Sequence, residues 1–299
     1  MLRKVVRLGG SCYIALPKAW LKAAGVKPGD YLELRVRNSS VLEVLVRAPL
    51  DEQSPRTCRI LETPWFEKSL LSAYLKGYDI IEITVRGDRR EVVERVEKLQ
   101  RLLIGLEIIE EHEDRIVLQC FTRTGYNLMS LLARMDSISR EMYVDAAKSL
   151  VSGDLRLAED VIARDDRLDR LYFLTVREVR ARLLSPETTG VERLRLMDLR
   201  LLSRELEEIG DLSESIARRA LKSHKVPVNF YEEATRLSDI QEKIVRGMLG
   251  GKVEDYRLAV RVDELVERLS KFDIGYEPYV VLLKRIAEKV RDIADLAPY

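Results

Sequence analysis

The sequence predicts a multidomain, mainly α-helical protein with a small β-strand module at its N-terminus, a small α/β domain in the middle and a six-helix body at its C-terminus. Three observations predict this class. Short runs of alternating apolar and polar residues open the chain, strand and helix patterns then alternate, and beyond Gly125 apolar residues keep a helical spacing almost to the end. At 299 residues, the chain can hold two or three domains with separate cores. The expected boundaries are 1–50 for the first module, 51–56 for a linker, 57–123 for the α/β domain and 124–299 for the helical body.

The composition indicates a cytoplasmic protein with no membrane insertion. No stretch approaches 18 uninterrupted apolar residues, and the first ten residues lack the apolar segment of a signal peptide. Cys12, Cys58 and Cys120 are too far apart for a Cys-x-x-Cys metal site, and we expect all three to be small buried apolar residues. Three Asn and four Gln against 51 Lys+Arg and 50 Asp+Glu suit a thermophile.

The net charge of +1 hides an asymmetry between the first module and the rest of the chain. Residues 1–50 hold nine Lys or Arg and three acidic residues, a net charge of +6, which leaves −5 for the other 249 residues. A small basic module on a neutral to acidic body points to nucleic acid as the module's partner and to a different partner for the body.

The first module is expected to form two hairpins and one short helix. Strand patterns cover residues 4–8, 12–16, 31–37 and 41–46, and a helix pattern covers 18–24 with Gly25 as its C-terminal cap. Fifty residues with four short strands cannot close a core alone. The module should therefore dimerise.

The run GGSCYIALPKAWLKAAGVKPGDYLELRV, residues 9–36, resembles the SpoVT/AbrB-type swapped-hairpin DNA-binding fold, above all in LPK…GVKPGD. The resemblance implies an interleaved homodimer whose basic first strands lie on DNA. The candidates for phosphate or base contacts are Arg3, Lys4, Arg7 and Lys18. The alternative is that these are solvated surface charges on a module that only dimerises, or that binds a protein.

Residues 57–123 alternate strands and helices. Strands are expected over 57–61, 79–85, 107–111 and 115–120, with one helix opening near Thr63-Pro64 and another over 89–103. This order predicts a small layered α/β domain. The residues suggest no chemical role for it.

Six helices are expected in the body, in two sets of three. Breaks fall at Ser152-Gly-Asp154, before Ser185-Pro186, ahead of Pro227, at Gly250-Gly251 and over 275–278. The two sets, about 124–223 and 226–299, form an internal repeat.

Two carboxylate pairs lie on consecutive helices of the first set. Asp165 with Asp169, and Glu207 with Asp211, are each four residues apart and so share a helix face. If the helices pack antiparallel, the pairs form a nest of four hard oxygen ligands that needs a cation or basic groups to offset its repulsion. On spacing alone, a solvated acidic face is the favoured reading, because acidic residues on helices usually face water.

The run ELEEIGDLSESIA, residues 205–217, resembles the signature of PhoU, the phosphate-uptake regulator family, and VIARDDRLDRL resembles its partner motif on the preceding helix. AYLKGYD and LIGLEIIEE are similar to archaeal PhoU-like proteins with an AbrB-type N-terminus. The resemblance implies a body of two three-helix bundles whose four carboxylates bind an iron or zinc cluster. It also implies a partner such as a phosphate-transporter ATPase or another regulatory protein. An oxygen-only ligand set lacks the His or thiolate that makes zinc or iron bind tightly.

The second repeat departs from this pattern. Ala259 and Asp263 stand where the first repeat has its two aspartates, and Lys284 and Glu288 stand where it has Glu207 and Asp211. A lysine in place of a carboxylate removes a ligand and supplies a cation. We therefore expect any metal in the first bundle.

No enzyme class fits the sequence. It has no Glu-x-x-His pair inside a helix, no Gly-rich phosphate loop and no nucleophile elbow. The predicted function is that of a homodimeric DNA-binding regulator of phosphate uptake and phosphate homeostasis, with a helical sensing or docking body. The alternative is a protein-interaction adaptor that docks on a phosphate transporter or sensor kinase, with the N-terminal module serving only dimerisation.

Overall fold

A computed structural model of the 299-residue chain gives the structure of residues 2–38, 40–46, 55–122, 125–185, 188–222, 226–250, 257–272 and 277–296. The chain divides into two compact units, Met1–Ser54 and Pro55–Tyr299, and each is described by itself. The predicted linker falls at this division. Its residues 51–54 lie outside the described residues, and Pro55 and Arg56 lead directly into a strand.

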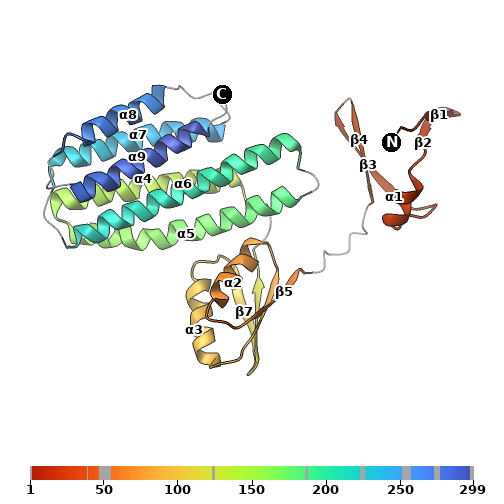
Figure 1. Cartoon of the computed structure of the whole chain (residues 1–299), viewed down its shortest axis with the longest axis horizontal. Coiled ribbons are helices and arrows are strands. Elements are labelled where there is room, and N and C mark those ends of the chain that lie inside the picture. Colours follow the sequence, from red (N-terminus) through yellow and green to blue (C-terminus); the bar gives the residue numbers. More distant parts are fainter. Residues whose placement is uncertain are drawn as a thin grey trace. The chain divides into compact units, whose positions relative to one another are not determined.

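The first unit consists of two separate antiparallel hairpins and a short helix (Figure 1). Its elements are β1 (Val5–Leu8), β2 (Ser11–Ile14), α1 (Lys18–Ala23), β3 (Leu32–Asn38) and β4 (Val41–Val46). The first hairpin turns at Gly9-Gly10, with Gly9 at a φ of 61°, a backbone conformation that glycine adopts without strain. The second strand ends two residues before the predicted Leu16, because Pro17 and its neighbours lead into α1.

One copy of this unit has no core of its own. Among the residues of 2–46 whose side chains the structure describes, none is buried. Neighbouring residues on β1 and β2, which point to opposite faces of the hairpin, are both exposed. Cys12 is exposed, so the prediction that all three cysteines are buried is wrong for it: a single copy provides no second layer. Cys58 is half-buried and Cys120 is buried.

Residues 55–122 form a four-stranded sheet with two helices. The elements are β5 (Thr57–Leu61), α2 (Phe66–Leu75), β6 (Ile80–Thr84), α3 (Arg89–Gln100), β7 (Leu106–Glu111) and β8 (Arg115–Cys120), and the strand order is β5-β6-β8-β7. β5 and β6 are parallel, as a helical crossover requires, and the remaining pairs are antiparallel. Phe66, Leu70 and Tyr74 of α2 are fully buried in the core with Ile81 and Ile83 of β6. The first helix begins at Phe66, two residues later than Pro64 suggested.

Most of the described residues beyond Asn127 are helical, which confirms the mainly α class. The helices are α4 (Leu128–Ser152), α5 (Leu155–Leu184), α6 (Gly190–Ala220), α7 (Val228–Gly250), α8 (Arg257–Leu269) and α9 (Glu277–Asp295). α4, α5 and α6 pack on one another, as do α7, α8 and α9, and the contacts α4–α7 and α6–α9 join the two sets (Figure 1). One apolar core runs through both sets.

Local signals in the sequence account for the helix ends. Gly153, at a φ of 76°, ends α4, and Asp154 caps α5 by accepting from the backbone N–H groups of Arg156 and Leu157. Thr189 and Glu192 form a reciprocal capping box at the start of α6. α9 begins at Glu277 and includes Pro278, since proline is tolerated in the first turn of a helix.

Helix α5 also joins the helical body to the α/β domain. Arg177, only 5% exposed, donates to the carbonyl oxygens of Tyr74 at 2.5 Å and Tyr78 at 3.3 Å, and its guanidinium lies 5.0 Å from the Tyr74 ring centre. The next residue, Glu178, is also buried and accepts from the backbone N–H of Gly125 at 3.1 Å. Two buried charged groups therefore attach α5 to the chain that precedes the helical body.

Within the part of the chain that the structure describes, no helix has both the length and the apolar character that crossing a membrane requires.

Candidate functional site

Close packing of α5 against α6 brings the predicted carboxylates together. At Gly210 a β-carbon would collide with the Leu168 side chain and would lie 3.4 Å from Oδ1 of Asp165. The glycine therefore lets the two helix backbones approach at the point where their acidic residues face each other.

Three of the four predicted ligands converge. Asp169, Glu207 and Asp211 each offer a carboxylate oxygen, and these oxygens all lie within 4.8 Å of one another. Asp165, one turn earlier on α5, is not part of that group of three. We call the four residues the acidic cluster.

Burial and mutual repulsion make these carboxyl groups hard to ionise. Burial, followed by the charge of Asp169, raises the pKa of Asp165 to about 7. Burial and Asp211 together raise the pKa of Asp169 to about 6 and that of Glu207 to about 7. Burial is also the main cause of the raised pKa of Asp211. Near neutral pH the cluster therefore retains protons unless a cation replaces them.

Two residues at this site were missed by the sequence analysis. Arg204 pairs with Glu207 at 2.7 Å and with Glu208 at 2.6 Å, and its charge opposes the rise in the pKa of Glu207. The charge of Glu214, itself paired with Arg218 at 2.5 Å, raises the pKa values of the three aspartates of the cluster. The available signal was spacing: Arg204 precedes Glu207 by three residues, and Glu214 follows Asp211 by three.

A second charged group lies beside the first and joins α6 to α9. Nζ of Lys289 is 3.1 Å from a carboxylate oxygen of Glu205 and 3.1 Å from one of Glu208. Burial opposes the charge of Lys289, but hydrogen bonds to the two glutamates outweigh it and raise its pKa. This lysine is a different residue from Lys284, which the repeat pattern had pointed to as the internal cation.

The second repeat shows no comparable group of ligands within the described residues. Asp263, the counterpart of Asp169, pairs with Arg291 of α9 at 3.2 Å. The counterparts of the acidic cluster in the second repeat are Ala259, Asp263, Lys284 and Glu288. Of these, Asp263 is ion-paired with an arginine.

The predicted DNA contacts all lie in the first unit. Arg3 and Lys4 precede β1, Arg7 lies on β1 opposite Cys12, and Lys18 is the first residue of α1. All four are exposed, and none has an ion-pair partner among the residues that the structure describes.

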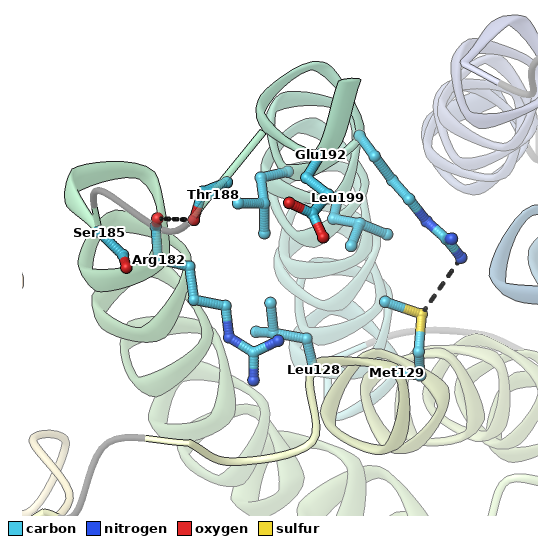
Figure 2. A pocket seen from close by; sticks show the side chains of 9 residues that line it. Leu128, Met129, Arg182, Ser185, Thr188, Glu192 and Leu199 are labelled. Atoms are coloured by element: carbon cyan, nitrogen blue, oxygen red, sulfur yellow. Dashed lines mark hydrogen bonds between the residues drawn. The ribbon is translucent and has the colours of Figure 1, made fainter. Parts of the chain in front are cut away.

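A hollow of about 620 Å³ at one end of the α5–α6 hairpin is not part of the acidic cluster (Figure 2). Thr188 donates to the Arg182 carbonyl at 2.6 Å, Glu192 belongs to the capping box, and Arg195 donates to the Leu249 carbonyl at 3.3 Å and contacts Met129 sulfur. Arg182 lies 13 residues along α5 from Asp169, or roughly 20 Å. These polar side chains are hydrogen-bonded to backbone groups near the helix ends, and we propose no ligand for this hollow.

Comparison with known proteins identifies one family. Residues 132–220 match the family model described as the PhoU domain, a segment that contains α5, α6 and the whole acidic cluster. Among solved structures, the crystal structure of PhoU from Pseudomonas aeruginosa is similar to this chain, with 21% sequence identity, a TM-score of 0.49, and coverage of 57% of this chain and 93% of that one. No curated protein matches. The predicted resemblance to PhoU is thereby confirmed for residues 132–220.

Proposed function

We propose that this chain is a non-catalytic, cytoplasmic regulator of phosphate homeostasis whose helical body docks on a transport or signalling protein. The observation that carries the proposal is the match of residues 132–220 to the PhoU domain. The resemblance to phosphate-uptake regulators supplies the partner class, a phosphate-transporter ATPase or a sensor kinase. A docking function is compatible with the matched segment, which contains α5 and α6, and it requires no catalytic residue.

The acidic cluster fits a hard divalent cation. Asp169, Glu207 and Asp211 offer three carboxylate oxygens within 4.8 Å, and raised pKa values mark groups that a cation would stabilise in their ionised form. The donors are all oxygen, which suits iron(II), manganese or magnesium better than zinc. A bound cation would offset the repulsion and hold α5 and α6 together.

A second copy of the chain would complete the first unit. Both faces of the β1–β2 hairpin are exposed in one copy, and an isolated two-stranded hairpin is at best marginally stable in water. An interleaved homodimer, as in the AbrB-type fold, supplies the missing layer.

DNA binding is the second candidate function. One observation favours it: Arg3, Lys4, Arg7 and Lys18 are exposed in the unit that carries the chain's positive charge. Cations without carboxylate partners are available for phosphate contacts. If the chain binds DNA, the same homodimer would bind an operator, and the helical body would change its affinity for that DNA.

The experiment that separates the two functions uses the tagged full-length chain in cells grown with ample or scarce phosphate. For the adaptor, we expect a phosphate-transporter subunit or sensor kinase to co-purify, and we expect Asp169→Asn with Asp211→Asn to change the recovery of that partner. The exposed pair Arg90→Gln with Arg180→Gln is the matched control and should leave recovery unchanged.

Genome-wide occupancy of the same tagged chain tests the second candidate. Sharp binding at phosphate-transport promoters, lost in Arg3→Glu with Arg7→Glu, would favour the DNA-binding regulator. A flat profile together with recovery of the transporter would leave the adaptor alone. A flat profile with no such partner would contradict both.

A further inference from the structure

A cleft of about 540 Å³ lies between the α/β domain and helix α5, away from the α6 side that carries the acidic cluster. The C-terminal end of α3 and the segment after it form one wall, and α5 forms the other. The lining residues are Lys98, Arg101, Leu102, Ala163, Asp166, Arg167 and Arg170. Both walls belong to the same compact unit, Pro55–Tyr299.

The cleft is strongly cationic. Lys98 and Arg101 on one wall face Arg167 and Arg170 on the other, and Asp166 is the one carboxylate in the lining. Each pair is three residues apart, so its two side chains lie on one side of a helical turn. The lining therefore carries a net charge of +3.

Several cations on the same helices have carboxylate partners, and these four do not. On α3, Arg95 pairs with Glu67 at 2.5 Å and Arg89 with Glu111 at 2.8 Å, and on α5, Arg164 pairs with Asp145 at 2.6 Å. No ion pair to Lys98, Arg101, Arg167 or Arg170 occurs within the described parts of the chain. Arg90 and Arg180 on these helices also have no ion pair among the described residues, so what sets the four cations apart is that they line one hollow.

We propose that this cleft binds a small anion with linked phosphate groups. Guanidinium groups bind phosphate oxygens through two parallel hydrogen bonds, and lysine adds a point charge. The volume lies within the range of small-molecule sites, about 300–1,000 Å³. Each wall carries two cations, and a chain of phosphates offers more anionic oxygens to four cations than a single phosphate does. Leu102 and Ala163 add uncharged surface between the two walls.

The inference goes beyond the proposed function and is independent of it. The cleft and the acidic cluster are on different sides of α5, and the two sites attract ligands of opposite charge. Docking on a partner protein requires neither a phosphate chain nor these four cations.

The test is calorimetric titration of the full-length chain with tripolyphosphate and with ATP, and with orthophosphate and AMP for comparison. We expect tripolyphosphate and ATP to bind at least 10-fold more tightly than orthophosphate and AMP, and we expect added salt to weaken the binding. Equal affinity for tripolyphosphate and ATP would show that the phosphate chain alone is recognised. Tighter binding of ATP would show that the nucleoside contributes.

Two charge-reversal pairs locate the site. Arg167→Glu with Arg170→Glu, and Lys98→Glu with Arg101→Glu, should each weaken tripolyphosphate binding at least 10-fold. Arg90→Glu with Arg180→Glu, exposed positions on the same helices but outside the cleft, should leave it unchanged. If a reversed pair does not fold, as judged by circular dichroism, the neutral pair Arg167→Gln with Arg170→Gln replaces it.

Three results would overturn the proposal. Neither tripolyphosphate nor ATP binds; or both bind but neither pair of cleft variants weakens them; or a single-stranded DNA oligonucleotide binds through the same four residues while tripolyphosphate does not. The last result would reassign the cleft to nucleic acid.

Discussion

At the scale of single residues, the carboxyl groups of the acidic cluster are held in an unfavourable state. Asp165 and Glu207 have pKa values of about 7, well above those of exposed carboxyl groups, with burial as the largest cause. Arg204 neutralises part of the charge from one side only. Ionisation of the cluster therefore lowers the free energy of unfolding, and a bound cation would raise it again.

This predicts a pH-dependent difference between the wild type and Asp165→Asn with Glu207→Gln, measured as Tm in the presence of a chelator. Because the folded pKa lies above the unfolded one, the protonated cluster stabilises the fold fully below about pH 4, and this stabilisation is lost as the pH rises through about 7. The variant cannot ionise at these two positions, so it carries at most the charges of Asp169 and Asp211. It should match the wild type near pH 4 and exceed its Tm by about 5 °C at pH 8.

A divalent cation at pH 8 should raise the Tm of the wild type more than that of the variant. A constant Tm difference from pH 4 to 8 would show that repulsion in the cluster is unimportant.

Some residues of the site could be predicted from sequence and others could not. The i, i+4 spacing together with the resemblance to PhoU singled out Asp169, Glu207 and Asp211, and the structure brings these three together. The basic cleft was missed because its walls, α3 and α5, are more than 60 residues apart in the chain, and each contributes charges that look like an ordinary solvated face. Only the tertiary contact shows that these charges lack carboxylate partners.

At the scale of secondary-structure elements, α5 connects the other helices of its set with the α/β domain. It packs on α6 through Leu168 and Gly210, joins the α/β domain through Arg177, and forms a wall of the basic cleft. Its ends were predictable because Gly153-Asp154 and Ser185 are strong local signals. The start of α2 was harder to predict. Thr63-Pro64 is a helix-opening signal, but the helix begins later, with Trp65 as its N-cap.

Gly210→Ala tests the contact between α5 and α6. The added methyl group would collide with Leu168 and crowd Asp165, so one helix has to shift. Overpacking costs about 1–3 kcal/mol, and the gain in helix propensity returns about 1 kcal/mol. We therefore expect a net loss of up to about 2 kcal/mol in the free energy of unfolding, measured by denaturant titration.

Gly190→Ala is the matched control, because a β-carbon there meets no atom within 4 Å. This variant should be neutral or slightly stabilising. Equal effects at both glycines would mean that the close approach at Gly210 contributes nothing.

At the scale of the whole molecule, the two units differ in how complete they are. The described part of Pro55–Tyr299 has continuous apolar cores, whereas the described part of the first unit has no buried residue and exposes Val5 by 61% and Ile14 by 52%. The sequence predicted this incompleteness from the small size of the module. It could not show which surface is left open, since that depends on the register of the hairpins.

Dimerisation through the first unit predicts that Val5→Asp with Ile14→Asp, a cross-strand pair on β1 and β2, shifts the full-length chain from dimer to monomer. Sedimentation velocity at micromolar concentration measures this. The control is Val191→Asp on α6, which removes a more exposed apolar side chain, at 79%, from the other unit. A wild-type monomer would contradict dimerisation, and a dimer that survives the β1–β2 pair would place the association elsewhere.

Glu208 has a consequence for how the two helical sets communicate. One of its oxygens binds Arg204, which also binds Glu207 of the acidic cluster, and the other binds Lys289 of α9. A cation bound at Glu207 would compete with Arg204 for that carboxylate. Arg204 shares Glu208 with Lys289, so this competition would act on an ion pair that joins α6 to α9. Cation binding in the first helical set would then be felt at its contact with the second set.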